Sequence, residues 1–238
     1  MAYGIFVTGT DTGVGKTLVS ATLIKLLQSF KLKVAAMKPI AAGSEWLDGE
    51  FKNSDAITLQ QAAALSIPYS TINPYALEPA IAPHIAADQI GVTIDLAVIK
   101  QSYGILQQQV DVVIVEGAGG WEVPMSSTQS MADIPVALNL SVIMVVGMRL
   151  GCLNHALLTQ QAIQARNIPL VGWVANCIDP DMKNQRDNIR YLQQAIQAPL
   201  LAHLPYQTPV NVQQLMSVFD RDVMDSVLAN VSINPVDK

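Results

Sequence analysis

A lysine and a threonine at the end of a glycine-containing loop are the first side chains in this sequence that could do chemistry. Residues 3–17 read YGIFVTGTDTGVGKT, in which an apolar run leads into a loop and Gly15, Lys16 and Thr17 open a helical pattern. This order places backbone N–H groups around an anion at a helix N-terminus, with the lysine on the terminal phosphates and the threonine hydroxyl on Mg²⁺. The segment therefore predicts a binding loop for a nucleoside triphosphate.

The loop departs from the usual G-x-x-x-x-G-K-[ST] pattern at its first glycine. Thr10 occupies that position, and Gly9 lies one place earlier. The alternative interpretation is a glycine turn between a strand and a helix, followed by a solvated lysine. The strand–loop–helix context is what a genuine phosphate loop requires, so it favours the functional interpretation.

Two carboxylates are candidates for binding Mg²⁺, which prefers oxygen ligands. Glu116 ends the third predicted strand, where ATPases of this class place an acidic residue that faces the metal; the alternative is that it accepts N–H bonds from the glycine loop that follows. Asp55 could equally cap a helix, and spacing alone does not decide its role. Asp111 lies at the start of the third strand, about 16 Å from its end, and is excluded.

Lys38 is a second candidate cation, because it follows an apolar strand and precedes a proline. It is either a strand-end charge that reaches solvent or a group aimed at phosphates and substrate. Two lysines at one site suit a reaction in which anionic charge builds up on carboxyl and phosphoryl oxygens. The three histidines are scattered, and no serine or cysteine lies in a nucleophile elbow. We therefore expect catalysis by positioning and electrostatics, without a covalent enzyme intermediate.

Short apolar runs alternate with longer segments of helical period along the whole chain. Runs that are apolar on both faces suit the strands of a parallel sheet covered by helices on both sides, which predicts a doubly wound, mostly parallel α/β fold. The strand candidates are Gly4–Val7, Val34–Met37, Val112–Val115, Val142–Val146, Leu170–Val174 and Leu200–Leu204. The helix candidates are Lys16–Phe30, Asp55–Ala64, Ile94–Gln109, Leu153–Ala165, Asn184–Ile196 and Asn211–Leu228.

The ends of these strands select the expected site, because ligands of such folds gather beyond the carboxyl ends of the strands. Polar residues and glycines cluster there: the phosphate loop, Lys38, residues 116–120, Gly147, the segment 149–155, Asn176 and Pro205. Two long excursions, residues 41–53 and 69–84, are interpreted as covers over the site, since long loops in compact domains are often functional.

Composition limits the class of protein. The 238 residues suit one domain spanning 1–238, of the P-loop NTPase type, and half of them are hydrophobic, which allows a large core. A net charge of −5 argues against nucleic acid as a partner. Cys152 and Cys177 lack the spacing of a disulfide framework or a zinc site. No signal peptide or membrane-spanning run is recognisable, so we expect no membrane partner and a cytoplasmic location.

Taken together, the motifs resemble those of the dethiobiotin synthetases, the ATP-dependent ring-closing enzymes of biotin synthesis. The resemblance runs from about residue 3 to about residue 206, and its most specific parts are the phosphate loop and the block after the third strand. The matching segments are GTDTGVGKT at 9–17, KP at 38–39, NSD at 53–55, PH at 83–84, VEGAGGW at 115–121, GCLNHA at 151–156 and GWVAN at 172–176.

The resemblance implies a reaction with 7,8-diaminononanoate, CO₂ and ATP. One amine captures CO₂ as a carbamate, ATP phosphorylates the carbamate, and the second amine closes the ureido ring and expels phosphate. By the same resemblance, Lys16 and Lys38 stabilise the carbamate and the transferring phosphoryl group, while Thr17, Asp55 and Glu116 hold Mg²⁺. Lys16 and Lys38 would be the catalytic residues.

The resemblance further implies that Asn154 contacts the substrate carboxylate across a homodimer interface. Ala42 stands near the substrate where such enzymes often carry a hydroxyl residue, which Ser44 could replace, and Gly13 stands where some members carry an acidic residue. Residues of the phosphate loop, of the block after the third strand and of two adenine-binding segments are implied to bind the nucleotide: Thr12, Gly13, Val14, Gly15, Lys16, Thr17, Leu18, Asp55, Glu116, Gly117, Ala118, Gly119, Asn176, Cys177, Pro205, Tyr206 and Gln207.

Two other classes of protein remain as alternatives. An ATPase switch of the ParA or MinD kind shares this fold, but uses a signature lysine five residues before the catalytic one, where this chain has Asp11. An ATP-dependent amide ligase would usually need an ammonia-producing domain with its own nucleophilic cysteine, for which this chain is too short.

Overall fold

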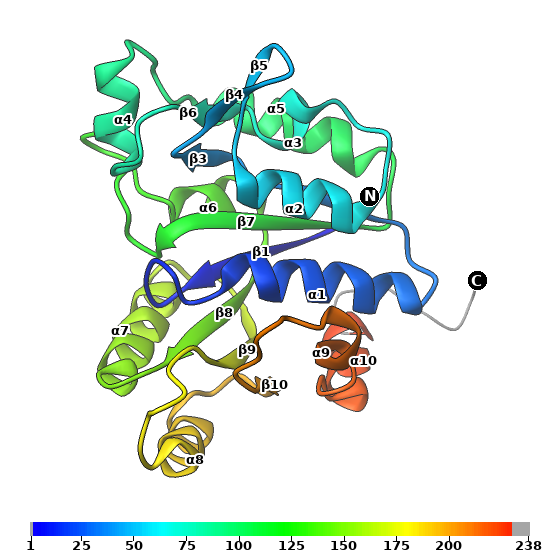
Figure 1. Ribbon diagram of the computed structural model, residues 1–238, viewed down its shortest axis with the longest axis vertical. Helices are drawn as coiled ribbons and strands as arrows, with labels where there is room; N and C mark the ends of the chain where they lie inside the picture. Colours follow the sequence, from blue (N-terminus) through cyan, green and yellow to red (C-terminus); the bar gives the residue numbers. More distant parts are fainter. Residues whose placement is uncertain (1, 230–238) are drawn as a thin grey trace.

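The computed structural model describes residues 2–229, and its centre is a parallel six-stranded sheet (Figure 1). The strand order β10-β9-β8-β1-β7-β2 places the first strand in the middle of the sheet, with the chain winding outward on both sides of it. The strands are β1 (Tyr3–Gly9), β2 (Val34–Met37), β7 (Val112–Gly120), β8 (Ser141–Met148), β9 (Leu170–Cys177) and β10 (Leu200–Leu204). The expected doubly wound parallel fold is confirmed.

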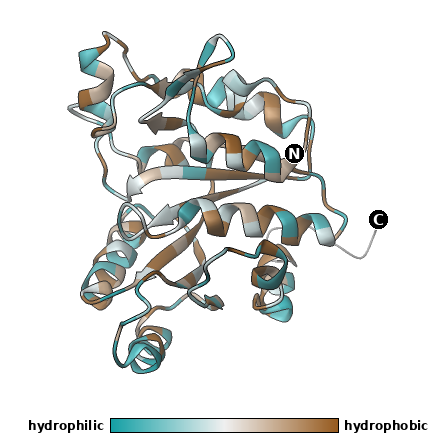
Figure 2. Cartoon of the chain, viewed as in Figure 1, coloured by the Kyte–Doolittle hydropathy of each residue, from teal (hydrophilic) through white to brown (hydrophobic). Residues whose placement is uncertain are grey.

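The sheet is buried on both faces, which is why its strands read as continuous apolar runs. Alternate residues of β1 point to opposite layers of the core: Ile5 and Val7 belong to one, and Phe6 belongs to the other. In Figure 2 the strands are mostly brown or pale, and most of the teal lies on helices and loops. No helix in the described part of the chain is long and apolar enough to cross a membrane.

Helices pack on both faces of the sheet. One layer of the core includes residues of α1 (Lys16–Ser29), α2 (Ser54–Ala63), α9 (Val212–Met216) and α10 (Arg221–Ala229). The other layer includes residues of α3 (Tyr69–Ile72), α4 (Pro83–Gln89), α5 (Leu96–Gln107), α6 (Asp133–Leu138), α7 (Cys152–Ala165) and α8 (Gln185–Ala195). The helices expected at the sheet agree with α1, α2, α5, α7 and α8 to within two residues at each end.

The expectation of one helix over Asn211–Leu228 is wrong, because two helices, α9 and α10, occupy this segment. Phe219 lies between them, buried against the core, and forms an isolated antiparallel bridge to Ala202 at the edge of the sheet. The Asp220 N–H donates to the carbonyl of Leu201. Pairing with the sheet therefore interrupts the helix, and helical periodicity alone did not reveal this.

The two excursions contain regular structure as well as loops. In the first, β3 (Ile40–Ala42) is followed by a hairpin of β4 (Glu45–Leu47) and β5 (Glu50–Lys52). In the second, α3 precedes β6 (Tyr75–Leu77), which pairs in parallel with β3, and α4 begins at Pro83. The two excursions are therefore joined to each other beside the carboxyl end of β2.

One further correction concerns Glu116, which was expected at the end of its strand. β7 continues four residues beyond it, and Gly120 still pairs with Gly9 of β1. Glycines permit this close approach, since a Cβ on Gly117 would lie 2.8 Å from the ring of Phe6. Glu116 is thus held inside the sheet, with its carboxylate fully buried.

Candidate active site

The phosphate loop connects the carboxyl end of β1 to the first residue of α1. Gly15 is the N-cap of α1 and has a left-handed backbone with φ of 88°. A Cβ at this position would lie only 2.1 Å from Nδ2 of Asn176, which itself donates to the carbonyl of Val14. Gly15 is therefore required twice, once for its backbone conformation and once for the close approach of β9.

Replacing Gly15 with alanine is expected to weaken nucleotide binding at least about tenfold, because relief of the clash must displace either the loop or Asn176. Gly49 offers a matched control, since its φ is also 88° but nothing lies within 4 Å of a Cβ built there. Gly49→Ala should share a backbone cost of about 1–2 kcal/mol and bind nucleotide normally. Titration of both variants with ATP, alongside urea unfolding, checks this; equal nucleotide affinities would contradict it.

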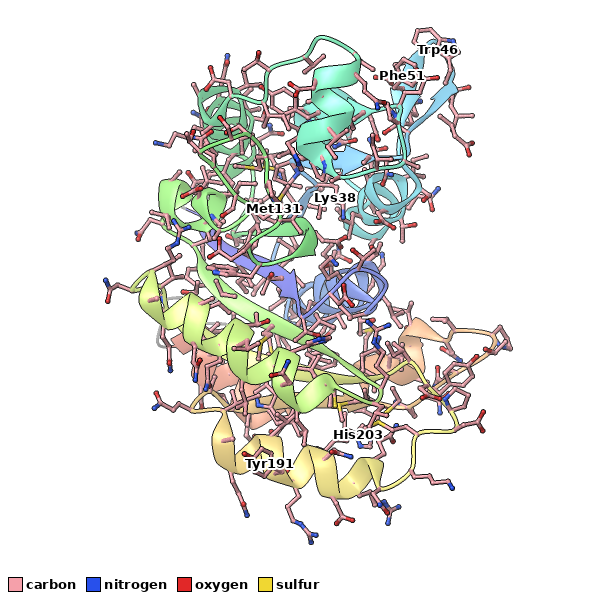
Figure 3. The ribbon with its side chains drawn as sticks, turned by 90° about the vertical axis from the view of Figure 1, so that its left-hand side faces the viewer. Lys38, Trp46, Phe51, Met131, Tyr191 and His203 are labelled. Atoms are coloured by element: carbon pink, nitrogen blue, oxygen red, sulfur yellow. The ribbon has the colours of Figure 1, made fainter. Side chains whose placement is uncertain are left out.

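The charged centre of the site is a buried ion pair. Nζ of Lys38 lies 2.6 Å from Oε1 of Glu116 and 3.3 Å from a carboxylate oxygen of Asp55, and it also donates to the carbonyl of Gly117. The hydroxyl of Thr17 donates to the same Glu116 oxygen at 2.9 Å. Lys38, which is labelled in Figure 3, is 3 % exposed, so it is not a strand-end charge extended into bulk solvent.

These contacts distinguish between the interpretations that the sequence left open. The cap of α2 is Asn53, whose side chain accepts from the N–H groups of Asp55 and Ala56, so the Asp55 carboxylate is free to face Lys38. The contacts of Glu116 are Thr17 and Lys38 instead of the N–H groups of the following glycines. Asp111 lies at the opposite end of β7 and accepts from the N–H of Lys33.

The two lysines of the site have opposite electrostatic surroundings. Burial lowers the pKa of Lys38, but the Coulomb attraction and hydrogen bonds of Glu116 and Asp55 outweigh burial and raise this pKa above its usual value. Burial, together with repulsion by Lys38, lowers the pKa of Lys16 to about 8. Its ammonium donates to the carbonyl of Asp11. Lys38 is thus compensated by protein carboxylates, whereas Lys16 is poised for an anion from outside.

The oxygen atoms of this cluster fit a divalent cation. Oε2 of Glu116 is buried and has no hydrogen-bond partner, which is an uncommon and costly state for a carboxylate oxygen. The Thr17 hydroxyl lies on the other oxygen of the same group, and the Asp55 side chain is 45 % exposed toward the adjoining cavity. Two carboxylates and a hydroxyl, completed by water and phosphate oxygens, are a donor set suited to Mg²⁺.

Two neighbouring cavities meet at Gly15. The larger has a volume of about 740 Å³ and is lined by residues of the phosphate loop, of both excursions and of the glycine block: Thr12, Gly13, Gly15, Lys16, Thr17, Lys38, Ala41, Ala42, Asn53, Asp55, Ala80, Ile81, Ala82, Pro83, Ala118, Gly119 and Val123. The smaller, of about 230 Å³, is lined by Gly15, Leu18, Asn176, Cys177, Ile178, Pro205, Tyr206, Gln207, Val210 and Leu215.

These linings include most of the residues that were expected to bind nucleotide or substrate. Val14, Glu116 and Gly117 line neither cavity. The carbonyls of Val14 and Gly117 accept from Asn176 and Lys38, respectively, and Glu116 contacts Thr17 and Lys38. Asn154 lies on the exposed surface of α7 and lines neither cavity of this chain. Ser44 is buried with an unpartnered hydroxyl and is not among the lining residues, so the structure shows no replacement at Ala42.

Some lining residues were missed from the sequence. Asn53 was noted only as part of a motif, and the apolar wall formed by residues 80–83 was included only in an undivided excursion. The proline-rich composition of that excursion was the available signal, but it did not indicate which residues turn inward. Cys152 and Cys177 are both buried free thiols, and Cys177 lies 3.1 Å from Nε2 of His203.

A glycine loop at the carboxyl end of β1, its lysine and threonine, and a buried acidic residue on the adjacent β7 together define a P-loop nucleotide-binding protein. Solved structures of similar fold are the septum site-determining protein MinD of Pyrococcus horikoshii and a ParA family ATPase of Chlorobium tepidum, each with a TM-score of 0.55 and 16% identity. The first comparison covers 94% of this chain and 89% of the other, and the second covers 99% and 95%. At this identity the likeness shows the fold alone.

The sequence comparisons are more specific. Residues 3–214 match a family model described as an AAA domain. The ATP-dependent dethiobiotin synthetase of Nitrosospira multiformis is 48% identical over 223 residues, covering 92% of this chain and 96% of the relative. Those of Xylella fastidiosa and Alteromonas mediterranea are 45% and 44% identical, covering 86% and 91% of this chain and 90% and 97% of the relatives. The chain belongs to the dethiobiotin synthetase family.

Proposed function

We propose that this protein is an ATP-dependent dethiobiotin synthetase, a ligase that converts 7,8-diaminononanoate and CO₂ to dethiobiotin with cleavage of ATP to ADP and phosphate. The observation that carries the proposal is the buried cluster of Lys38, Glu116 and Asp55 beside the phosphate-loop lysine, at the junction of two cavities. Membership of the family supplies the identity of the substrates. The site supplies groups that suit each step.

In the first two steps, one amine nitrogen of the diamine attacks CO₂ and loses a proton, which gives a carbamate. A carbamate oxygen then attacks the γ-phosphorus of ATP, and ADP leaves. Lys38 and Lys16 both border the larger cavity, where their ammonium groups would stabilise the negative charge on the carbamate and the transferring phosphoryl group. Thr17, Asp55 and Glu116 would hold Mg²⁺, which would supply further positive charge to the phosphate oxygens.

In the last step, the second amine attacks the carbonyl carbon of the mixed anhydride, phosphate leaves with the bonding electron pair, and the amine loses a proton as the ring closes. The chain contributes position and charge to this step. The apolar wall at Ala80, Ile81 and Ala82 borders the same cavity and suits the alkyl chain of the substrate. The leaving phosphate would lie beside the ammonium of Lys16, which borders the same cavity.

The smaller cavity is the proposed adenine site. It adjoins the phosphate loop at Gly15 and is bordered by Asn176 and by residues 205–207, so a nucleotide bound there would place its phosphates on the loop.

We further propose a homodimer, in which Asn154 of each copy would contact the substrate held by the other. We also propose a cytoplasmic location, where ATP is available. Sedimentation equilibrium tests the dimer.

Glu116→Gln is expected to raise the Mg²⁺ concentration needed for half-maximal activity by about ten- to a hundredfold. The change removes the charge of the buried carboxylate but keeps its size. Glu122→Gln is a matched control, because Glu122 is an exposed carboxylate on the loop that follows the same strand. Activity measured across a Mg²⁺ titration checks this, and an unchanged Mg²⁺ requirement would remove Glu116 from the proposed metal site.

The experiment that tests the function supplies the protein with 7,8-diaminononanoate, ATP, Mg²⁺ and labelled bicarbonate, and measures label in dethiobiotin together with phosphate release. The expected result is one phosphate for each labelled product. Phosphate release at the same rate with and without the diamine would instead support an ATPase switch. Against the switch stands Asp11, which occupies the position of the signature lysine and is ion-paired with Arg149. If no phosphate is released at all, the proposal fails and carboxylate substrates of an amide ligase become the next test.

A further inference from the structure

A chain of hydrogen bonds runs behind the active site and joins Lys38 to the helix that carries Asp55. It passes through Asn53, Tyr69 and Asn73, which are 7 %, 7 % and 2 % exposed. The N–H of Asn53 donates to the Tyr69 hydroxyl at 2.7 Å, the hydroxyl donates to Oδ1 of Asn73 at 2.9 Å, and Nδ2 of Asn73 donates to the carbonyl of Lys38 at 2.6 Å.

The direction of each bond in this chain is fixed by chemistry. A backbone N–H can only donate, so the Tyr69 hydroxyl must accept from Asn53 and give its own proton to Asn73. The amide nitrogen of Asn73 faces two carbonyls, those of Lys38 and Tyr75, which fixes the orientation of its side chain. Burial raises the pKa of Tyr69, so the phenol keeps the proton that it donates. Each donor in this chain of hydrogen bonds therefore has an acceptor, and the protons have a single arrangement.

At one end, the chain holds the backbone of Lys38. β2 ends at Met37, so Lys38 has left the ladder of the sheet, and the next residue is Pro39, which has no N–H. The N–H of Lys38 donates to the carbonyl of Ile72 at 2.8 Å, and its carbonyl accepts from the Asn73 side chain. Two consecutive residues at the end of α3 thus fix the peptide from which the catalytic ammonium extends.

At the other end, the chain holds the start of α2. The Asn53 side chain accepts from the N–H of Asp55 and donates to the carbonyl of Ala42, which borders the cavity. On the side of the cavity, Nζ of Lys38 lies 3.3 Å from the carboxylate of Asp55. Backbone and side chains form a closed ring, which links the hydrogen bonds behind the site to the two charged groups in front of it.

We propose that Tyr69 and Asn73 are positioning residues, which act through Lys38 and Asp55 to hold the ammonium and the carboxylate at the distance that catalysis requires. The inference rests on the proposed function for the nature of the reaction. Neither residue lines either of the two cavities described above, so neither would touch a substrate bound there. Displacements of about 1 Å in an active site cost roughly a hundredfold in rate, which gives a single buried hydroxyl a large effect on turnover.

The test uses Tyr69→Phe, which removes only the hydroxyl. Tyr103→Phe is the matched control, because Tyr103 is also buried, and its hydroxyl accepts from Gln107, away from the site. For Tyr69→Phe we expect kcat to fall about ten- to a hundredfold, while KM for ATP changes less than about threefold. Tyr103→Phe should keep the wild-type kcat at temperatures where both variants are folded.

A second variant distinguishes a chain of interactions from separate effects. If Tyr69 acts through Asn73, then Asn73→Ala combined with Tyr69→Phe should lower kcat little more than either change alone. The proposal is overturned if the losses of kcat in the two single variants multiply in the double variant. It is also overturned if Tyr69→Phe has the same kcat as Tyr103→Phe. Hydrogen exchange gives a readout without turnover, since Tyr69→Phe should speed exchange of the Asn53 amide at least tenfold. A wild-type protein that makes no dethiobiotin would overturn the proposed function instead, and the exchange result would still show whether the Tyr69 hydroxyl holds the backbone of Asn53.

Discussion

Lys38→Met is expected to lower kcat about a thousandfold while ATP affinity stays within severalfold of the wild type. Methionine keeps most of the length and the apolar stem of lysine, so the change removes the charge and its hydrogen bonds. Loss of one well-placed electrostatic group from a water-excluded site typically costs 10²–10³ in kcat, roughly 3–4 kcal/mol. Lys16, the phosphate loop and the proposed adenine site remain, so we expect the nucleotide still to bind. Single-turnover phosphate release and ATP titration measure the two effects separately.

The same substitution should also destabilise the fold. Glu116 has no exposed surface, and Lys38 is its closest charged partner at 2.6 Å. Breaking a buried pair by removing one partner typically costs about 3–5 kcal/mol, because the other charge is left uncompensated. Arg190→Met is a suitable control, since Arg190 pairs with Asp187 on the exposed surface of α8, where such pairs contribute about 0–1 kcal/mol.

A double variant separates stability from catalysis. Lys38→Met combined with Glu116→Gln removes both buried charges and should recover much of the lost stability, because no uncompensated charge remains. It should nevertheless be as inactive as Lys38→Met alone. A double variant that recovers turnover along with stability would mean that Lys38 matters for folding only. A loss of ATP affinity with normal kcat would instead assign Lys38 to the nucleotide.

The sequence predicted the strands of the sheet well, for a reason that is visible in Val34–Met37 and Leu200–Leu204. Both runs are flanked by polar or turn-forming residues and are apolar enough to pair inside a covered sheet, and both match β2 and β10 without error. Because the carboxyl ends of parallel strands share one edge, strand position alone brought Lys38 and the phosphate loop together. This part of the site follows from topology.

The parts that sequence could not predict depend on contacts between distant segments. The role of Asp55 needed Asn53 to be the cap and Lys38 to lie 3.3 Å away, and neither fact is contained in the local pattern. The same holds for Phe219, whose bridge to Ala202 breaks a helix that periodicity made continuous. Tyr69 and Asn73 lie in a proline-flanked segment with no recognisable motif. Asn73 nevertheless donates to the carbonyl of Lys38, more than thirty residues earlier in the chain, and Tyr69 donates to Asn73.

Lys16→Met is expected to abolish turnover, with kcat at least about a thousandfold lower, and here the effect on stability should have the opposite sign. Folding lowers the pKa of Lys16 from an ordinary 10.5 to about 8, first through burial and then through repulsion by Lys38. At pH 7 the folded protein without nucleotide therefore carries this charge at a cost on the order of 3 kcal/mol. Methionine removes the cost and keeps the apolar stem.

The sign of the pH dependence follows from the direction of that shift. The cost is fully present below pH 8, where Lys16 is charged in both states, and it disappears as the pH rises through 8 toward 10.5. Without nucleotide, Lys16→Met should thus be more stable than the wild type at pH 7, with a difference that shrinks by pH 10. Saturating ATP should reverse the order at pH 7, because binding stabilises the wild type more. Urea unfolding of both proteins at pH 7 and pH 10, with and without ATP, measures the difference in stability under each of the four conditions. If Lys16→Met is less stable than the wild type at pH 7 without nucleotide, Lys16 stabilises the fold and the predicted sign is wrong.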